Sequence, residues 1–182
     1  MNNESNDMKT WKQFLTEQAE HEFSSTQVNL PLMLSSKITR WAKSLIDKDD
    51  LFGDGFEDEP HVTVLFGLHS NEPDQVKELL KDEPPVELVL QSTSIFETDE
   101  FDVVKLGVES EDLARLHNKI ADHCEFTATH QKYSPHCTLA YVKKGCGKKY
   151  AGDKEFEGTK VTIDKVLFSN KNRIKTSIVL GT

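Results

Sequence analysis

The sequence lacks the features that mark secreted, membrane-spanning or disulfide-stabilised proteins. Its three cysteines, Cys124, Cys137 and Cys146, form no CxxC pair, and their odd number argues against a disulfide framework. No apolar run approaches the roughly 20 residues that a membrane helix needs, and the polar N-terminus has no signal-peptide core. These absences predict a cytoplasmic protein with reduced thiols and no membrane partner.

The chain also lacks the excess of positive charge that long nucleic acids require. Its formal net charge is −9, and the charges are unevenly distributed. Residues 1–129 hold 11 basic and 27 acidic side chains, whereas residues 130–182 hold 11 and 4. Such a protein is not expected to bind long duplexes through counterion release, although its basic C-terminal third suits a small anion. A merely solvated, lysine-rich surface is the alternative.

The hydrophobic spacing predicts one α+β domain over residues 24–182, after a tail or short amphipathic helix over residues 1–23. Ser35 or Ser36 is expected to cap the first helix of the domain, and Ser110 the third. Acidic residues and two glycines predict a loop over 47–59. Strands are expected over 25–32, 86–96, 101–108, 159–168 and 173–180, and helices over 38–46, 72–80 and 110–120. This order predicts two similar halves, and the protein is expected to be a monomer.

One short pattern occurs twice in the chain. Residues 60–66 read PHVTVLF and residues 135–141 read PHCTLAY, so five positions match by chemical type. A proline fits at the start of a strand, where no N–H is needed, and each copy is therefore expected to begin a strand. Strict alternation along that strand predicts that the closing aromatics, Phe66 and Tyr141, face the core with the aliphatic residues.

The same alternation predicts that His61 shares a face with Thr63, and His136 with Thr138. Two histidines on opposite sides of a phosphate suit in-line transfer, since one accepts the proton of the attacking oxygen while the other donates to the leaving oxygen. Imidazole, with an unperturbed pKa of about 6.5, has both protonation states near neutrality. The threonine hydroxyls would bind non-bridging oxygens, and no metal or other cofactor is expected.

This paired motif resembles the 2H phosphoesterase superfamily of LigT-like proteins and cyclic phosphodiesterases. The resemblance rests on His61-Val62-Thr63 and His136-Cys137-Thr138, which are 75 positions apart. It implies a bilobal fold with two pseudo-symmetric halves of antiparallel sheet around a central cleft. It also implies a metal-independent phosphodiesterase in which the histidines are acid and base and the threonines bind phosphate.

The implied substrates are cyclic nucleotides, cyclic oligonucleotides, 2′,3′-cyclic phosphates and 2′-5′ linked RNA. Residues 8–17 resemble a leader that directs internal proteins of tailed phages into the capsid, which favours the phage branch that degrades cyclic oligonucleotide immune signals in the host cytoplasm. An RNA end-processing 2′-5′ ligase or cyclic phosphodiesterase is the alternative. Because the net charge is negative, a small nucleotide or a short oligonucleotide is favoured as partner over long RNA. Tyr133 and Lys132 are candidates for base stacking and phosphate steering, or else ordinary loop residues.

Three competing interpretations remain at this point. A zinc site would use the histidines and cysteines between His117 and Cys146, but His117 and His123 lie six apart on a predicted helix and face different ways. A nucleotide-sequestering protein without turnover would not need two titratable groups. A structural role, with His61 and His136 hydrogen-bonded in a core, suits one lone histidine better than a repeated unit.

Overall fold

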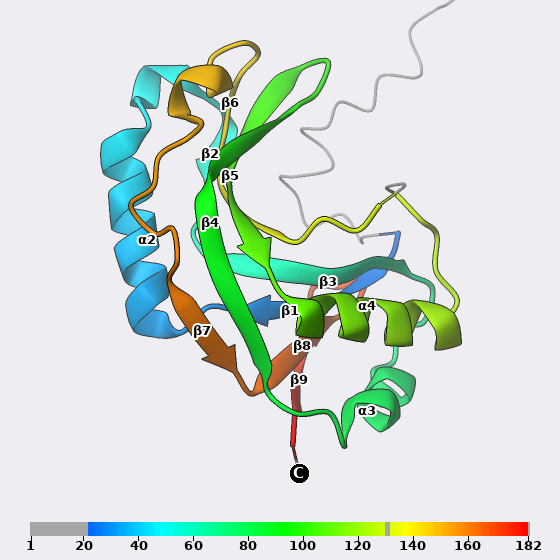
Figure 1. Ribbon diagram of the computed structural model, residues 1–182. Helices are drawn as coiled ribbons and strands as arrows, with labels where there is room; N and C mark the ends of the chain where they lie inside the picture. Colours follow the sequence, from blue (N-terminus) through cyan, green and yellow to red (C-terminus); the bar gives the residue numbers. More distant parts are fainter. Residues whose placement is uncertain (1–21, 130–131, 182) are drawn as a thin grey trace, which may run out of the picture.

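The computed structural model describes residues 22–129 and 132–181, and Figure 1 shows their arrangement. The expected N-terminal helix and the leader-like residues 8–17 lie outside the described residues. Within them, no helix has the length and apolar character that crossing a membrane requires.

The fold is an α+β structure built on one curled antiparallel sheet (Figure 1). The strands follow the order β7-β4-β5-β6-β3-β1-β8-β9, with β2 also paired to β6. Their bounds are β1 Ser24–Asn29, β2 Leu51–Phe56, β3 His61–Leu68, β4 Val86–Glu97, β5 Phe101–Glu109, β6 His136–Lys143, β7 Lys160–Ile163, β8 Lys165–Ser169 and β9 Lys175–Val179. The helices are α2 Leu32–Leu45, α3 Asp74–Leu80 and α4 Glu111–His123, with 3-10 turns η1 Lys48–Asp50 and η2 Gly147–Tyr150.

The two strands that carry the repeated motif are neighbours at the centre of this sheet. β3 and β6 run antiparallel, and Val62 pairs with Cys137. On one side β3 pairs with β1, and on the other β6 pairs with β5. The predicted two halves are therefore β3-β1-β8-β9 and β6-β5-β4-β7, joined through the motif strands themselves.

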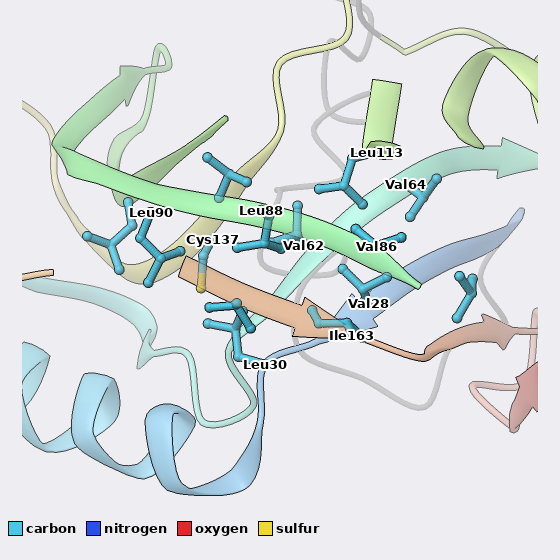
Figure 2. Packing of buried hydrophobic residues seen from close by; sticks show 14 of the residues in the cluster. Val28, Leu30, Val62, Val64, Val86, Leu88, Leu90, Leu113, Cys137 and Ile163 are labelled. Atoms are coloured by element: carbon cyan, nitrogen blue, oxygen red, sulfur yellow. The ribbon is translucent and has the colours of Figure 1, made fainter. Parts of the chain in front are cut away.

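One face of the sheet is covered by helices and forms the core. Val62 and Cys137 are both fully buried, in one hydrophobic cluster with Ile38 of α2 and Leu113 of α4. Helix α2 contacts β2 and β6, while α4 contacts β3 and β4. Figure 2 shows Val62 and Cys137 among the side chains of the core strands. Since strand neighbours point to opposite faces, the histidines and threonines lie on the other face.

Both motif strands carry an irregularity at the same place. In β3 the register moves from Thr63 opposite Gln27 to Leu65 opposite Thr26, which leaves Val64 as an extra residue. In β6 it moves likewise from Thr138 opposite Lys105 to Ala140 opposite Val104. Two copies of the repeat thus share a β-bulge, a feature that increases local twist and redirects side chains.

The bulge corrects the expectation that the aromatics closing the repeat face the core. Because one residue is added after each threonine, Leu65 and Ala140 take the core positions and are buried. Phe66 and Tyr141 are half-buried instead. Strict alternation held from each histidine through the threonine to the buried Val64 and Leu139, and it was wrong for the two residues that follow.

Three predicted boundaries were also wrong. The acidic segment 47–59 forms η1 and β2, because Phe56 pairs with Ala140 and packs against the core. Residues 159–168 are two strands, β7 on β4 and β8 on β1. The first helix begins at Leu32 after Pro31, so Ser35 and Ser36 lie inside it and cap nothing.

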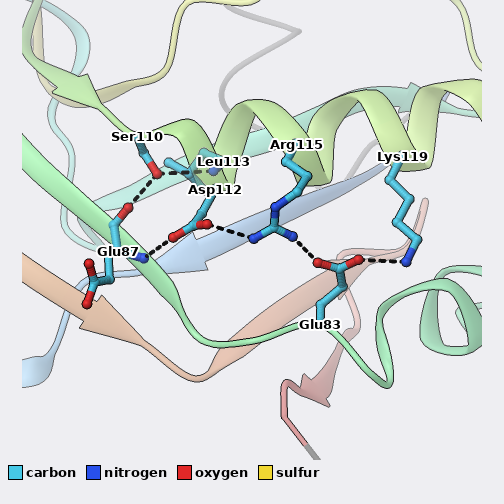
Figure 3. Close-up of polar contacts among 7 residues, drawn as sticks. All are labelled: Glu83, Glu87, Ser110, Asp112, Leu113, Arg115 and Lys119. Carbon is cyan, nitrogen blue, oxygen red and sulfur yellow. Dashed lines mark hydrogen bonds and ion pairs between the residues drawn. The ribbon is translucent and has the colours of Figure 1, made fainter.

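The expected cap of the third helix is confirmed, and a polar network extends from it (Figure 3). The Ser110 hydroxyl accepts a hydrogen bond from the Leu113 N–H at 3.0 Å and donates to the Glu87 carbonyl at 2.5 Å. Asp112 accepts from the Glu87 N–H at 2.9 Å. Glu83 bridges Arg115 and Lys119. These contacts fix α4 against the start of β4.

Candidate active site

The pairing of the motif strands brings the four predicted site residues together. Because Val62 lies opposite Cys137 in an antiparallel pair, His61 lies beside Thr138, and Thr63 lies beside His136. All four side chains are half-buried. The two histidines are therefore diagonal neighbours on the open face, each with the threonine of the other motif at its side.

The two imidazoles are held in the same way. His61 Nδ1 lies 2.8 Å from the carbonyl oxygen of Glu59, and His136 Nδ1 lies 2.9 Å from that of Ser134. A carbonyl oxygen only accepts hydrogen bonds, so Nδ1 must carry the proton in both rings. The nitrogen that can exchange a proton with a bound molecule is then Nε2 in each case.

Two further contacts tie the first motif to residues 133–137, at and just before the second motif. The backbone of His61 hydrogen-bonds the thiol of Cys137, whose pKa burial raises to about 12. The Tyr133 hydroxyl donates to the carbonyl oxygen of Thr63 at 2.9 Å. Cys137 is thus a neutral packing residue at the junction, not a nucleophile.

Tyr133 and Lys132, the candidates for substrate binding, occupy different environments. The Tyr133 ring is stacked on His117, with centroids 4.0 Å apart, and burial raises its pKa. His117 in turn donates from Nδ1 to the carbonyl of Val64 at the bulge, at 2.7 Å. Lys132 is exposed. Tyr133 therefore braces the motif strand, and at least one face of its ring is covered.

Sequence reasoning missed two residues on the open face, Lys105 and Phe96. Lys105 is only 7 % exposed and lies opposite Thr138 in the β5–β6 pair. Phe96 is 39 % exposed and meets the His136 ring edge to face, with centroids 5.0 Å apart. The signal that could have identified Lys105 is its position as the single lysine within the predicted strand 101–108, which is otherwise mostly apolar.

The basic C-terminal third does not present an unbroken positive face. Several of its lysines are matched by acidic residues from the first two thirds of the chain: Lys144 with Asp102, Lys148 with Glu97, and Lys149 with Asp50. Folding therefore neutralises part of the positive charge that the sequence concentrates in its last third.

A cavity of about 560 Å³ lies apart from the motif residues. It is lined by the end of β3, the start of α3 and the end of α4, including His69, Gln75 and His123. None of the four motif residues lines it. Among the described residues, no group of three or more His, Cys, Asp and Glu side chains is placed to hold a metal ion.

The fold has clear relatives among solved structures. The protein TT0787 of Thermus thermophilus superposes with a TM-score of 0.60 at 15 % identity, over 87 % of this chain and 98 % of that one. Escherichia coli LigT complexed with 3′-AMP gives 0.59 at 18 % identity, over 88 % and 95 %. Usb1 of Kluyveromyces marxianus gives 0.59 at 9 % identity, over 88 % and 99 %. At these identities the likeness establishes the fold alone.

A family model decides the assignment, since the 2′-5′ RNA ligase superfamily model matches residues 31–146, more than half of the chain. The chain belongs to the 2′-5′ RNA ligase superfamily. A sequence search of the curated proteins finds no match. As a member of this superfamily, the protein carries both HxT units inside the matched residues.

Proposed function

We propose that the protein is a phosphodiesterase that uses His61 and His136 as an acid and base pair on small nucleotide substrates. The observation that carries this proposal is the shared orientation of the two rings, because in each ring the Nδ1–H is bound to a backbone carbonyl and Nε2 is therefore the basic nitrogen that can exchange a proton. A purely structural pair would not need the same orientation twice on the open face of adjacent strands.

On a 2′,3′-cyclic phosphate, one Nε2 accepts a proton from water as its oxygen attacks phosphorus. The other imidazolium donates a proton to the ribose oxygen that leaves, so the product is a phosphomonoester with one free hydroxyl. On a 2′-5′ linkage, the vicinal 3′-hydroxyl replaces water and the 5′-oxygen leaves, which gives a cyclic phosphate. The hydroxyls of Thr63 and Thr138 donate to the non-bridging oxygens as negative charge develops.

Small nucleotides and short oligonucleotides are the proposed substrates. Solved relatives contain 3′-AMP in LigT and uridine monophosphate in Usb1, which supports ligands of this size. Phe96, partly exposed beside His136, supplies an apolar surface that a nucleobase can cover. Cyclic oligonucleotide immune signals are a narrower proposal, which rests on the resemblance of residues 8–17 to a phage leader.

The test is a substrate panel of 2′,3′-cyclic nucleotides, 2′-5′ oligoadenylates, and cyclic di- and trinucleotides, with products resolved by mass. We expect cleavage of at least one class by the wild-type protein and none by a double His61→Asn and His136→Asn variant. Chromatographic separation of the 2′- and 3′-phosphate products, which have equal mass, shows which oxygen leaves. Binding across the panel without any cleavage would overturn the enzymatic proposal in favour of a protein that sequesters nucleotides.

A further inference from the structure

Lys105 is a buried cation that no described carboxylate neutralises. Its Nζ donates to the hydroxyl of Ser94 at 2.9 Å and lies 4.2 Å from the centroid of the Phe96 ring. Among the described residues it forms no ion pair, and burial lowers its pKa. Lysine is almost never buried unless it is paired, and desolvating a charge without a partner is unfavourable.

Other lysines near β5 and β6 do have carboxylate partners. Lys144, Lys148 and Lys149 are all more exposed than Lys105, yet each has a carboxylate within 4 Å. Folding therefore supplies counter-charges where solvent already screens the cation, and supplies none where the cation is buried. The missing counter-charge beside the motif residues is explained if an anionic ligand provides it.

Lys105 faces the same side of the sheet as the motif. Its direct neighbour across β5 and β6 is Thr138, and such paired residues have Cβ atoms about 5 Å apart. Gly107, two residues along, lies opposite His136 and places no side chain there. Phe96 contacts both the ammonium group and the His136 ring. The cation thus lies within side-chain reach of the second motif.

The corresponding position in the other half is neutral. Because both motif strands carry the bulge at the same place, β1 is the counterpart of β5. Gln27 lies opposite Thr63 in the β1–β3 pair, just as Lys105 lies opposite Thr138 in the β5–β6 pair. Gln27 is also 7 % exposed, and its amide donates to Asn29 Oδ1 at 2.7 Å. Two equally buried positions beside two equivalent threonines therefore differ by one positive charge.

We propose that Lys105 is a phosphate ligand of the site, binding a non-bridging oxygen on the Thr138 side and so fixing which way round the phosphate lies between the two histidines. The proposal rests on the proposed function for its substrate, but the anion site itself does not require turnover. The charged ligand supplies the missing counter-charge, and Gln27 leaves the opposite side less attractive to an anionic oxygen. The pseudo-symmetric site is thereby made directional.

The experiment compares Lys105→Gln with Lys105→Arg and with a control, Lys165→Gln, at an exposed strand position. Lys105→Gln places at position 105 the side chain that is found at position 27. Binding of inorganic phosphate is measured by calorimetry, and kcat and KM are measured on the substrate that the panel identifies. Lys105→Gln is expected to weaken phosphate binding about 10- to 100-fold, the value of one charge-assisted hydrogen bond. Lys105→Arg is expected to keep most of the binding, and Lys165→Gln all of it.

Because the ammonium group is buried without a counter-charge, Lys105→Gln is expected to unfold at the same temperature as wild type or higher, so weaker binding cannot be ascribed to misfolding. Wild-type phosphate affinity in a folded Lys105→Gln protein would overturn the assignment of Lys105 even if the enzyme turns over. Phosphate binding that depends on Lys105, in a protein that cleaves nothing in the panel, would uphold the anion site and overturn only the proposed function.

Discussion

The hydrogen bond from His61 Nδ1 to the Glu59 carbonyl allows catalysis and stability to be separated by one substitution. Asparagine has an amide nitrogen at the same number of bonds from Cα as Nδ1, so His61→Asn can keep the bond that spans 2.8 Å in the wild type. Alanine cannot. Neither replacement has a group that exchanges a proton near neutral pH.

The expected magnitudes follow from these two roles. Loss of a positioned acid or base lowers kcat by roughly 10²- to 10⁴-fold, and this loss should be the same for His61→Asn and His61→Ala. The retained hydrogen bond contributes about 0.5–1.5 kcal/mol to the free energy of unfolding. For a chain of this length, about 1 kcal/mol corresponds to roughly 2–4 °C in Tm. His61→Ala should therefore unfold a few degrees below His61→Asn.

The assay pairs initial rates on the substrate found in the panel with thermal unfolding followed by circular dichroism. His136→Asn and His136→Ala provide a second, independent test, since His136 Nδ1 makes the same kind of hydrogen bond to the carbonyl of Ser134. Equal Tm values for the asparagine and alanine variants would refute the assigned tautomer. Turnover within threefold of wild type in either asparagine variant would refute the catalytic role.

Three further predictions concern the threonines, the fold and metals. Thr138→Ala should lower kcat by on the order of 10- to 1000-fold, whereas Thr138→Ser, which keeps the hydroxyl, should have a kcat near that of wild type. An equal loss of kcat in both variants would mean that the hydroxyl does not bind the transition state. Ser110→Ala should lower the free energy of unfolding by about 1 kcal/mol in urea titrations, while Ser36→Ala, exposed on α2, should change it by less than about 0.5 kcal/mol. Activity should survive EDTA, and a loss that zinc restores would contradict proton transfer by histidines alone.

The sequence predicted the central strands well because their pattern was local. A proline before each histidine and alternating residues after it are sufficient to place His61 and His136 at strand starts on one face. The third helix was predicted for the same reason, since Ser110 and the apolar spacing behind it act within a few residues.

The errors arose where distant contacts decide the structure. Residues 47–59 have a loop-like composition, yet pairing with β6 turns part of them into a strand. Residues 159–168 have continuous strand character, and only the separate partners β4 and β1 divide them at Asp164. The stack of Tyr133, a candidate for base stacking, on His117 was likewise not predicted, because His117 lies sixteen positions earlier and becomes a neighbour only after α4 packs.

The position of Asp164 affects how the two halves can move. β7 ends at Ile163 on one edge of the strand path, and β8 begins at Lys165 beside β1 in the other half. A single residue therefore links strands that the hydrogen-bonded order separates by five others, and the Leu180 N–H donates to the Asp164 carbonyl at 2.8 Å. The halves are thus fastened at the motif strands and again at this link. A hinge that swings the halves apart would strain the link, so the two motif strands are expected to keep their relative position when a ligand binds.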